Sequence, residues 1–269
     1  MAEKKDTKLL SVIIPAYKKE NTILSELKRI KGVLEKIRYD YEIIVVVDGR
    51  VDKTYQQAKK AASPKIRVYQ YKNNKGKGYA IRYGMARAKG DPIAFIDAGM
   101  EIDPNGISIA LEHMEWYQAD IIVGSKRHPA SQVNYPFQRK VISFAYQRFV
   151  RFFTGLNVSD TQAGLKIYRR KVLEEVLPRL LVKRYAFDLE LLVVAYHLGF
   201  RRIYEAPIKL NYNFEDIHAT ALFGVNGMQR SLVDTLAIIY RLRILRYYNN
   251  GNKRKWRYDP ELDFKVNIG

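Results

Sequence analysis

Short runs of apolar, mostly β-branched residues recur through the first half of the chain, and the segments between them place apolar residues at helical spacing. Continuous apolar runs are typical of strands buried on both faces, whereas helical spacing buries one side of a helix. The predicted strands are 9–17, 41–48, 66–71, 92–97 and 120–124, and the predicted helices are 21–38, 52–62, 78–89 and 104–117. This alternation predicts an α/β fold with a mostly parallel, Rossmann-like sheet and helices on both faces.

The second half of the chain is richer in helical patterns. Segments 135–154, 170–180 and 185–198 predict helices, and 203–210 predicts one more strand. The last predicted helix, 224–248, is amphipathic. Its apolar face carries Val225, Met228, Leu232, Val233, Leu236 and Ile239. The polar, aromatic tail that follows is expected to be an extended appendage, so the predicted domains are 1–220 and 221–269.

Composition narrows the classes of protein. A chain of 269 residues with 47% hydrophobic residues can bury a substantial core, and the absence of cysteine excludes disulfides and thiolate catalysis. No apolar run approaches the ~18 residues of a transmembrane helix, and the first residues lack the pattern of a secretory signal, so we expect a cytoplasmic location. The net charge of +19, concentrated in 126–184 and 228–257, predicts anionic partners: phosphates, nucleic acid or an anionic membrane surface.

Acidic residues follow two of the predicted strands. Asp48 ends "EIIVVVD", and Asp97 lies in "FIDAGMEID", residues 95–103. Ligands of parallel α/β sheets bind outside the carboxyl ends of the strands. The second stretch is therefore either a solvated turn or a metal site for a diphosphate, whereas Asp52 and Asp103 are expected to cap helices.

A glycine-rich segment, "NNKGKGYAIRYG" (73–84), precedes a predicted helix. Lys77 between two glycines could cradle a phosphate at the helix N-terminus, but an ordinary glycine turn explains the pattern equally well. The segment lacks the spacing of a Walker loop and of a dinucleotide-binding fingerprint.

Seven segments carry a resemblance when they are taken in order. They are "SVIIPAYKKENTI", "EIIVVVDGRVDKT", "NKGKGYAIRYGMARAKGD", "IAFIDAG", "IIVGSKR", "DTQAGLKIYRR" and "FDLELLVVAYHLGFRRIYEAPI". Over residues 9–210 the chain resembles a family 2 glycosyltransferase of the GT-A fold, in the dolichyl- or polyprenyl-phosphate branch. Its motifs are closest to the glucosyltransferases of that branch.

The resemblance implies a GT-A catalytic domain at 1–220 that transfers a hexosyl group, with inversion, to a polyprenyl or dolichyl phosphate. Glucose is the favoured sugar, and UDP-glucose is favoured over GDP-mannose as the donor. The implied donor-site residues are Pro15, Tyr17, Glu20, Asp48, Lys77 and Asp97.

A divalent metal, Mg²⁺ or Mn²⁺, is also implied by the resemblance, because Asp97 matches the first acid of the family's Asp-x-Asp signature. The second acid is replaced by Gly99, and Glu101 could compensate as a second metal ligand. In addition, Val47 precedes Asp48 where the family carries a further Asp, and Lys18-Lys19 replace the usual Asn-Glu pair.

The acceptor side of the resemblance uses basic residues. The positions that hold the lipid phosphate match Lys126, Arg139 and Ser143, and Arg127 could substitute for Lys126. The alternative is that these residues form a solvated basic surface without a ligand. Asp160 is implied as the catalytic carboxylate beside Asp97, with Gln162, Lys166, Asp188 and Glu190 in support.

Other functions remain open at this point. The substituted donor motifs fit a catalytically impaired member that binds nucleotide or lipid phosphate, whereas charge alone would fit a nucleic-acid-binding protein. No recognisable nucleic-acid motif is present, so no nucleic-acid partner is expected. A peripheral position on the inner face of the membrane is expected if the apolar face of 224–248 meets lipid. That face could instead pack on the catalytic domain.

Overall fold

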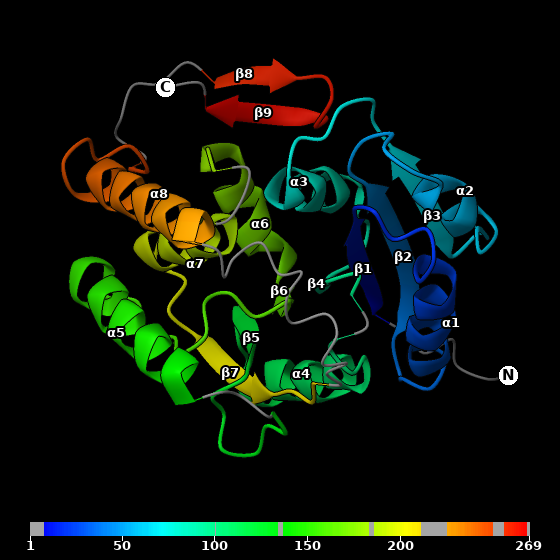
Figure 1. Cartoon of the computed structure of the whole chain (residues 1–269), viewed down its shortest axis with the longest axis horizontal. Helices are drawn as coiled ribbons and strands as arrows, with labels where there is room; N and C mark the ends of the chain where they lie inside the picture. Colours follow the sequence, from blue (N-terminus) through cyan, green and yellow to red (C-terminus); the bar gives the residue numbers. More distant parts are fainter. Residues whose placement is uncertain are drawn as a thin grey trace, which may run out of the picture.

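A computed structural model describes most of the chain. In two short helical segments, 137–143 and 225–228, it describes only the backbone. The described residues are 8–99, 101–133, 137–182, 186–210, 225–249 and 256–267. At the centre lies a seven-stranded sheet of order β3-β2-β1-β4-β6-β5-β7, with helices against both faces (Figure 1). The predicted α/β architecture is therefore confirmed.

The sheet is parallel apart from one strand. Its members are β1 (Leu9–Ala16), β2 (Asp40–Val47), β3 (Ile66–Gln70), β4 (Ile93–Ile96), β5 (Ile121–Ser125), β6 (Leu165–Tyr168) and β7 (Ile203–Pro207). Strand β6 is antiparallel to both of its neighbours, β4 and β5. The sequence pattern did not predict β6, because this four-residue strand includes a lysine that looks incompatible with full burial.

The helices follow the predicted segments, with ends shifted by a few residues. They are α1 (Ile23–Leu34), α2 (Thr54–Lys59), α3 (Lys77–Arg87), α4 (Asn105–Trp116), α5 (Phe137–Thr154), α6 (Arg170–Val176), the 3₁₀ helix η1 (Leu177–Arg179), α7 (Phe187–His197) and α8 (Val225–Arg243). The N-caps of α2 and α4 are Lys53 and Pro104, one residue beyond the predicted Asp52 and Asp103. The two aspartates nevertheless accept the backbone N–H groups of Thr54 and Asn105, the first residues of these helices.

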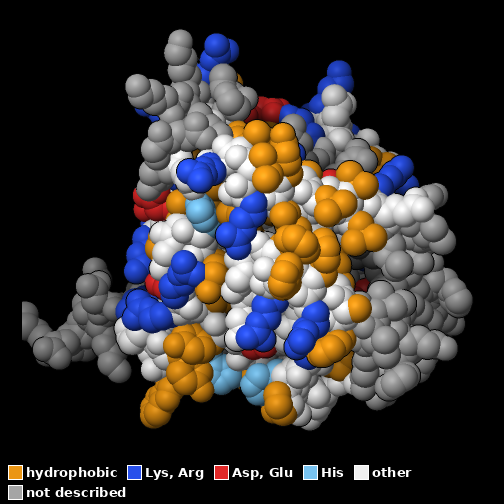
Figure 2. All heavy atoms as spheres, turned by 90° about the vertical axis from the view of Figure 1, so that its left-hand side faces the viewer, with side chains coloured by type: hydrophobic (Ala, Val, Ile, Leu, Met, Phe, Trp, Pro, Cys, Tyr) orange, Lys and Arg blue, Asp and Glu red, His pale blue; other side chains and the backbone are white. Residues whose placement is uncertain are grey.

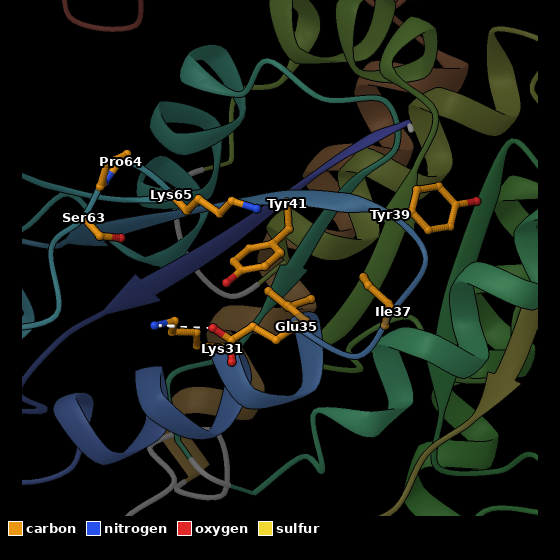
Figure 3. A pocket seen from close by; sticks show the side chains of 9 residues that line it. Lys31, Glu35, Ile37, Tyr39, Tyr41, Ser63, Pro64 and Lys65 are labelled. Atoms are coloured by element: carbon orange, nitrogen blue, oxygen red, sulfur yellow. Dashed lines mark ion pairs between the residues drawn. The ribbon is translucent and has the colours of Figure 1, made fainter. Parts of the chain in front are cut away.

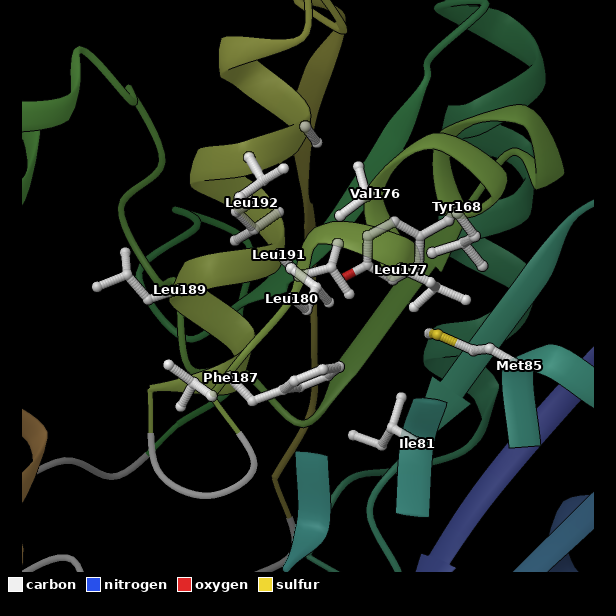
Figure 4. Packing of buried hydrophobic residues seen from close by; sticks show 14 of the residues in the cluster. Ile81, Met85, Tyr168, Val176, Leu177, Leu180, Phe187, Leu189, Leu191 and Leu192 are labelled. Carbon is white, nitrogen blue, oxygen red and sulfur yellow. The ribbon is translucent and has the colours of Figure 1, made fainter. Parts of the chain in front are cut away.

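Two apolar cores lie on the two faces of the sheet. Strand β1 contributes to both, because Val12 and Ile14 point to one face and Ile13 points to the other. The first core is covered by α1 and α4. The second is larger and packs α3, α6, α7 and part of α8 around Phe187 and Tyr168 (Figure 4). These cores fix the strand ends on which the candidate site is built.

The described part of the C-terminal tail packs on this second core. Strands β8 (Trp256–Asp259) and β9 (Phe264–Asn267) form an antiparallel hairpin, and Leu262 between them is 2% exposed. Glu261 forms an ion pair with Lys75 and accepts the hydroxyl hydrogen of Tyr79 on α3. The expectation of an extended appendage is therefore wrong for residues 256–267, because burial of Leu262 and these polar contacts tie the hairpin to α3.

Helix α8 buries a different face from the one that its apolar pattern predicts. Its buried residues are Ser231, Thr235, Ile238 and Leu242, and Tyr146 of α5 makes a 2.8 Å hydrogen bond with Thr235. Of the predicted apolar face, Leu232, Val233 and Leu236 are exposed and Ile239 is half-buried, whereas the side chains of Val225 and Met228 lie outside the described part of the structure. Figure 2 shows hydrophobic and basic side chains interspersed on the side of the molecule that carries α5 and α8. Among the described residues, no helix combines the length and apolarity needed to cross a membrane.

Candidate functional site

One edge of the sheet collects most of the predicted site residues. The carboxyl ends of β4 and β5 lead into Asp97 and Lys126 at this edge. Because β6 is antiparallel to both strands, its amino end meets the same edge, and the N–H of Asp97 donates to the carbonyl of Gly164 at 3.0 Å. The antiparallel strand thus brings the 160–166 segment between the two predicted halves of the site, where α/β sheets bind ligands.

Four charged side chains form a continuous series at this edge, which we call the charge row: Asp97, Lys77, Asp188 and Lys166. The ammonium of Lys77 lies 2.8 Å from each carboxylate oxygen of Asp97 and 3.7 Å from Asp188. The ammonium of Lys166 lies 2.8 Å from Asp188 and also donates to the carbonyl of Ala163. Two lysines therefore balance two aspartates.

Exposure falls along the charge row from one end to the other. The side chains of Asp97 and Lys77 are 40% and 37% exposed, whereas those of Asp188 and Lys166 are 7% and 0% exposed. Burial lowers the pKa of Lys166, and the attraction of Asp188 only partly offsets it. Burial would raise the pKa of Asp188, but the two lysines outweigh that effect and the pKa is lowered. Asp188 is thus held as a carboxylate.

Lys77 shows the opposite balance from Lys166. Burial would lower the pKa of Lys77, but the charges of Asp97 and Asp188 outweigh burial and raise it above the ordinary lysine value. The residue remains an ammonium ion at neutral pH, so the solvent-facing end of the charge row carries a permanent cation.

Two glycines let the charge row assemble. A Cβ on Gly164 would lie 2.4 Å from Oδ2 of Asp97, so only glycine allows the carboxylate to rest against this backbone. A Cβ on Gly78 would lie 2.5 Å from Phe187, the residue before Asp188. Close approach of the start of α3 to the start of α7 therefore places Lys77 beside Asp188.

Asp48 has a structural role in this arrangement. It is 3% exposed, and its two oxygens accept hydrogen bonds from Tyr71, Asn74 and the backbone N–H groups of Lys75 and Gly76, at 2.7–3.0 Å. The carboxylate thereby fixes the loop that leads into Lys77. Its predicted contact with the base or ribose stays a prediction.

The remaining donor-side residues follow β1. Pro15 is buried in the strand, and Tyr17, just beyond it, is 43% exposed. Glu20 accepts the backbone N–H of Lys53 at 2.9 Å, which ties the loop after β1 to the start of α2. An exposed tyrosine at the end of a strand is free to meet a ligand, whereas Glu20 acts on the shape of the loop.

On the acceptor side, Asp160 and Lys126 lie together. The N–H of Lys126 donates to Asp160 at 3.1 Å, and its ammonium lies 4.0 Å from the same carboxylate. Arg127 donates to Gln147 of α5. Glu205 of β7 accepts the N–H groups of Ser159 and Asp160 and so positions the loop. Glu205 lies in the segment "FDLELLVVAYHLGFRRIYEAPI", whose pattern predicts no role for it.

The supporting residues divide into two groups. Gln162 contacts Ser231 of α8 at 3.5 Å, which links the site to the C-terminal helix. Glu190 is fully buried and accepts the N–H groups of Leu181 and Val182 and the hydroxyl hydrogen of Tyr248. It is a scaffold residue. Arg139 and Ser143 lie four residues apart on α5, and their side chains are outside the described part of the structure.

The contact between Lys77 and Asp97 bears on the implied metal. Mg²⁺ is held by oxygen ligands, through one or two carboxylates together with substrate phosphates. Both Asp97 oxygens already face an ammonium, residue 99 has no side chain, and no group of three or more His, Cys, Asp or Glu suited to a metal occurs among the described residues. Glu101 lies near residue 99, where a Cβ would be 3.9 Å from its Oε1. In this arrangement the side chains do not form a divalent-cation site, and metal ligation by Asp97 and Glu101 stays a prediction.

A separate hollow lies away from the candidate site. Its lining comes from the end of α1, the start of β2 and the segment before β3, including Lys31, Glu35, Tyr41 and Lys65 (Figure 3). None of the predicted site residues lines it. The amino ends of parallel strands rarely carry the ligand site of an α/β sheet, so we assign it no role.

The comparison with sequence families decides the class of protein. The sequence profile described as Glycosyl transferase family 2 matches residues 11–177, which is more than half of the chain. The chain belongs to glycosyl transferase family 2. The matched range contains the donor-side residues, Lys126 and Asp160, so the predicted family is confirmed.

Two relatives illustrate the family. Dolichyl-phosphate beta-glucosyltransferase of Drosophila melanogaster is 34% identical over 205 residues, which are 70% of this chain and 63% of the fly protein. The human protein of the same name is 31% identical over 222 residues, or 77% of this chain and 68% of the relative. The chain therefore spans less than two thirds of the length of the fly relative.

Solved structures share the fold at low sequence identity. Glucosyl-3-phosphoglycerate synthase from Mycobacterium tuberculosis, in complex with uridine diphosphate, superposes with a TM-score of 0.65 at 16% identity, covering 93% of this chain and 84% of that one. The same enzyme with Mn²⁺, UDP-glucose and phosphoglyceric acid gives a TM-score of 0.62 at 18% identity, with coverage of 93% and 84%. The predicted GT-A fold is thereby confirmed.

Proposed function

We propose that this family 2 glycosyltransferase transfers glucose from UDP-glucose to a polyprenyl or dolichyl phosphate, with inversion at the anomeric carbon. The observation that carries the proposal is the placement of two oppositely charged pairs on one sheet edge. Asp97 follows β4 and pairs with Lys77, Lys126 follows β5 and pairs with Asp160, and β6 lies between these strands. The relatives named for transfer to dolichyl phosphate support the choice of acceptor.

The chemistry needs little proton transfer from the protein. A phosphate acceptor is already an anion near neutral pH, so one of its oxygens can attack the anomeric carbon directly. A carbon–oxygen bond forms to the lipid phosphate, the bond to the UDP oxygen breaks, and the electron pair of that bond leaves with UDP. Positioning and charge neutralisation therefore do most of the catalytic work.

The residues on the acceptor side are suited to hold the lipid phosphate. We infer that Lys126, Arg127, Arg139 and Ser143 bind it, while Asp160 orients the acceptor or the sugar. The side chain of Lys126 is 29% exposed, and both its backbone N–H and its ammonium lie beside Asp160, so it places a positive charge at this edge of the sheet. Tyr17 and Pro15 would line the nucleotide pocket beyond β1.

A panel of donors tests the proposed reaction. The full chain is incubated with a short polyprenyl phosphate and each of several UDP- and GDP-sugars, with and without Mn²⁺. We expect glucosyl transfer from UDP-glucose and far less from GDP-mannose. Absence of transfer from every donor would favour the alternative of a member that binds nucleotide or lipid phosphate without catalysis, as the substitution at Gly99 suggests.

We also propose that the protein binds the anionic surface of a membrane through α5 and α8. Phe144 and Phe152 of α5, with Val233 and Leu236 of α8, are 54–81% exposed. Arg148, Arg151 and Arg230 on the same two helices are exposed as well. Apolar side chains among arginines are typical of helices that lie in the interface of anionic bilayers. Because α5 also carries Arg139, the surface would bring the lipid phosphate near the site.

Vesicle binding tests this surface. The variant Val233→Glu with Leu236→Glu should bind mixed phosphatidylglycerol–phosphatidylcholine vesicles at least about tenfold more weakly, since two apolar contacts become repelled charges. Both positions are exposed, so the fold should tolerate the change. Ile109→Glu on α4, where the isoleucine is 43% exposed, is the matched control and should bind as the wild type does. Equal binding by all three proteins would contradict the α5–α8 surface.

A further inference from the structure

The ammonium of Lys77 occupies the position in front of Asp97 that a divalent cation would need. It lies 2.8 Å from both oxygens of this carboxylate and 3.7 Å from Asp188. Lys77 is the first residue of α3, and the packing of Gly78 on Phe187 fixes where that helix begins. The fold therefore fixes the backbone position from which Lys77 reaches Asp97.

Among the residues that the structure describes, Asp97 does not belong to any group of three or more His, Cys, Asp or Glu suited to hold a cation. Gly99 supplies no side chain, and a Cβ there would meet only the side chain of Glu101, at 3.8–3.9 Å. A divalent ion on Asp97 would also lie next to the Lys77 ammonium, and like charges at such short range repel. Lysine and metal would therefore compete for one carboxylate.

Lys77 is suited to bind a diphosphate in place of a metal. An ammonium has three N–H donors, and its hydrogen bond to Oδ2 of Asp97 uses one of them. Oδ1 of Asp97 at 2.8 Å and Asp188 at 3.7 Å are ion-pair contacts, so donor capacity remains for a phosphate oxygen. The group is 37% exposed and lies at the N-terminus of α3, where the helix dipole also favours an anion.

We propose that Lys77 supplies the positive charge that holds the donor diphosphate, so that nucleotide binding by this protein does not require a divalent cation. The inference rests on the proposed function, because it assumes a nucleoside-diphosphate donor. It differs from the metal dependence that the resemblance implies. Lys77, which is paired with Asp97, would supply the positive charge that a bound metal would otherwise supply.

Calorimetric titration of UDP into the full chain tests the inference, once with EDTA and once with Mn²⁺. The wild type should bind UDP with affinities that agree within about threefold in the two buffers. Lys77→Met should bind at least about tenfold more weakly in EDTA, the loss expected for one charge-assisted hydrogen bond. Mn²⁺ should restore part of that loss, because Asp97 is then free to bind the ion. Lys77→Arg should retain most of the metal-free affinity.

Controls separate the roles of lysine and metal. Lys65→Met removes a surface lysine that pairs with Asp40, at the far edge of the sheet, and should leave UDP binding unchanged. Asp97→Asn should preserve metal-free binding if Lys77 holds the diphosphate, and should abolish binding if a metal does. Melting temperatures confirm that each variant is folded.

Two outcomes would overturn the inference in different ways. If EDTA weakens UDP binding by the wild type more than about tenfold and Asp97→Asn removes it, the site depends on metal and Lys77 is not its substitute. The proposed function would then stand. If no UDP binds to the wild type in either buffer, the nucleotide donor is wrong, and the proposed function falls together with the inference.

Discussion

The outer and inner ends of the charge row each pair a lysine with an aspartate, but the two pairs differ in exposure and in the direction in which the lysine pKa is shifted. Lys77 and Asp97 are more than one third exposed, whereas Lys166 and Asp188 are buried within the core. The pKa of Lys77 is raised because two carboxylates outweigh burial, and the pKa of Lys166 is lowered because burial outweighs its carboxylate. Distance from solvent, rather than residue type, sets this difference.

This difference in exposure distinguishes the pair that maintains the fold from the pair that can bind a ligand. A buried pair that loses one partner leaves an uncompensated charge in a medium of low polarity, which destabilises the fold strongly. An exposed pair contributes little to stability, because water competes for both ions. The inner pair should therefore maintain the fold, and the outer pair should be available to exchange partners when an anionic ligand arrives.

The largest expected effect comes from breaking the inner pair. Lys166→Met should lower the free energy of unfolding by about 3–5 kcal/mol, because Asp188 is left charged and buried. Lys77→Met at the outer end should cost no more than about 1 kcal/mol. Urea unfolding measures both. The double variant Lys166→Met with Asp188→Leu should recover part of the loss, and equal losses from the two single variants would contradict the distinction between the ends.

A smaller and purely functional effect is expected at Lys126, which is partly exposed like the outer pair. Lys126→Ala should reduce kcat/KM for the polyprenyl phosphate by about ten- to a hundredfold, equivalent to about 1.5–3 kcal/mol for a lost charge-assisted hydrogen bond. UDP affinity and the melting temperature should hardly change. Arg148→Ala, which removes an exposed cation of α5, should cost less. Equal losses that follow ionic strength would indicate a diffuse basic surface.

The smallest expected effect concerns Glu190, a buried carboxylate whose nearby cation is Arg241, at 3.8 Å, rather than a lysine. Burial raises the pKa of Glu190, although hydrogen bonds from Tyr248 and from two backbone amides and the charge of Arg241 partly oppose it. A raised pKa means that Glu190 favours folding most at pH values below its unfolded pKa of about 4.3. This contribution is lost as the pH rises through the folded pKa.

Glu190→Gln stays neutral at every pH, so the variant should gain stability relative to the wild type as the pH rises from about 4.5 to about 8. Each kcal/mol of that gain corresponds to about 2–4 °C in melting temperature for a domain of this size. Thermal melting across the pH series measures the difference. A difference that is constant or that shrinks with pH would show that burial does not control this carboxyl.

The sequence by itself determined the class of fold, the family and the chemical types in the site. Long apolar runs such as 41–48 must be buried, and in a parallel sheet this places Asp48 and Asp97 at strand ends. Helix positions followed for the same reason, since a strong period of 3.6 residues requires one buried face. These are local properties, and neighbouring residues are enough to reveal them.

The tertiary structure alone decided which charges meet and which apolar faces are covered. Strand β6 is short and antiparallel, and its Lys166 is buried only because Asp188, 22 residues later, lies 2.8 Å away. Asp48 points into the protein because Tyr71 and the 74–76 loop supply its hydrogen-bond donors. Helix α8 buries Thr235 and Ile238 and leaves Val233 and Leu236 exposed, and its contact with α5 includes the hydrogen bond between Thr235 and Tyr146. A residue's own neighbours in the chain cannot reveal a partner that only folding brings close.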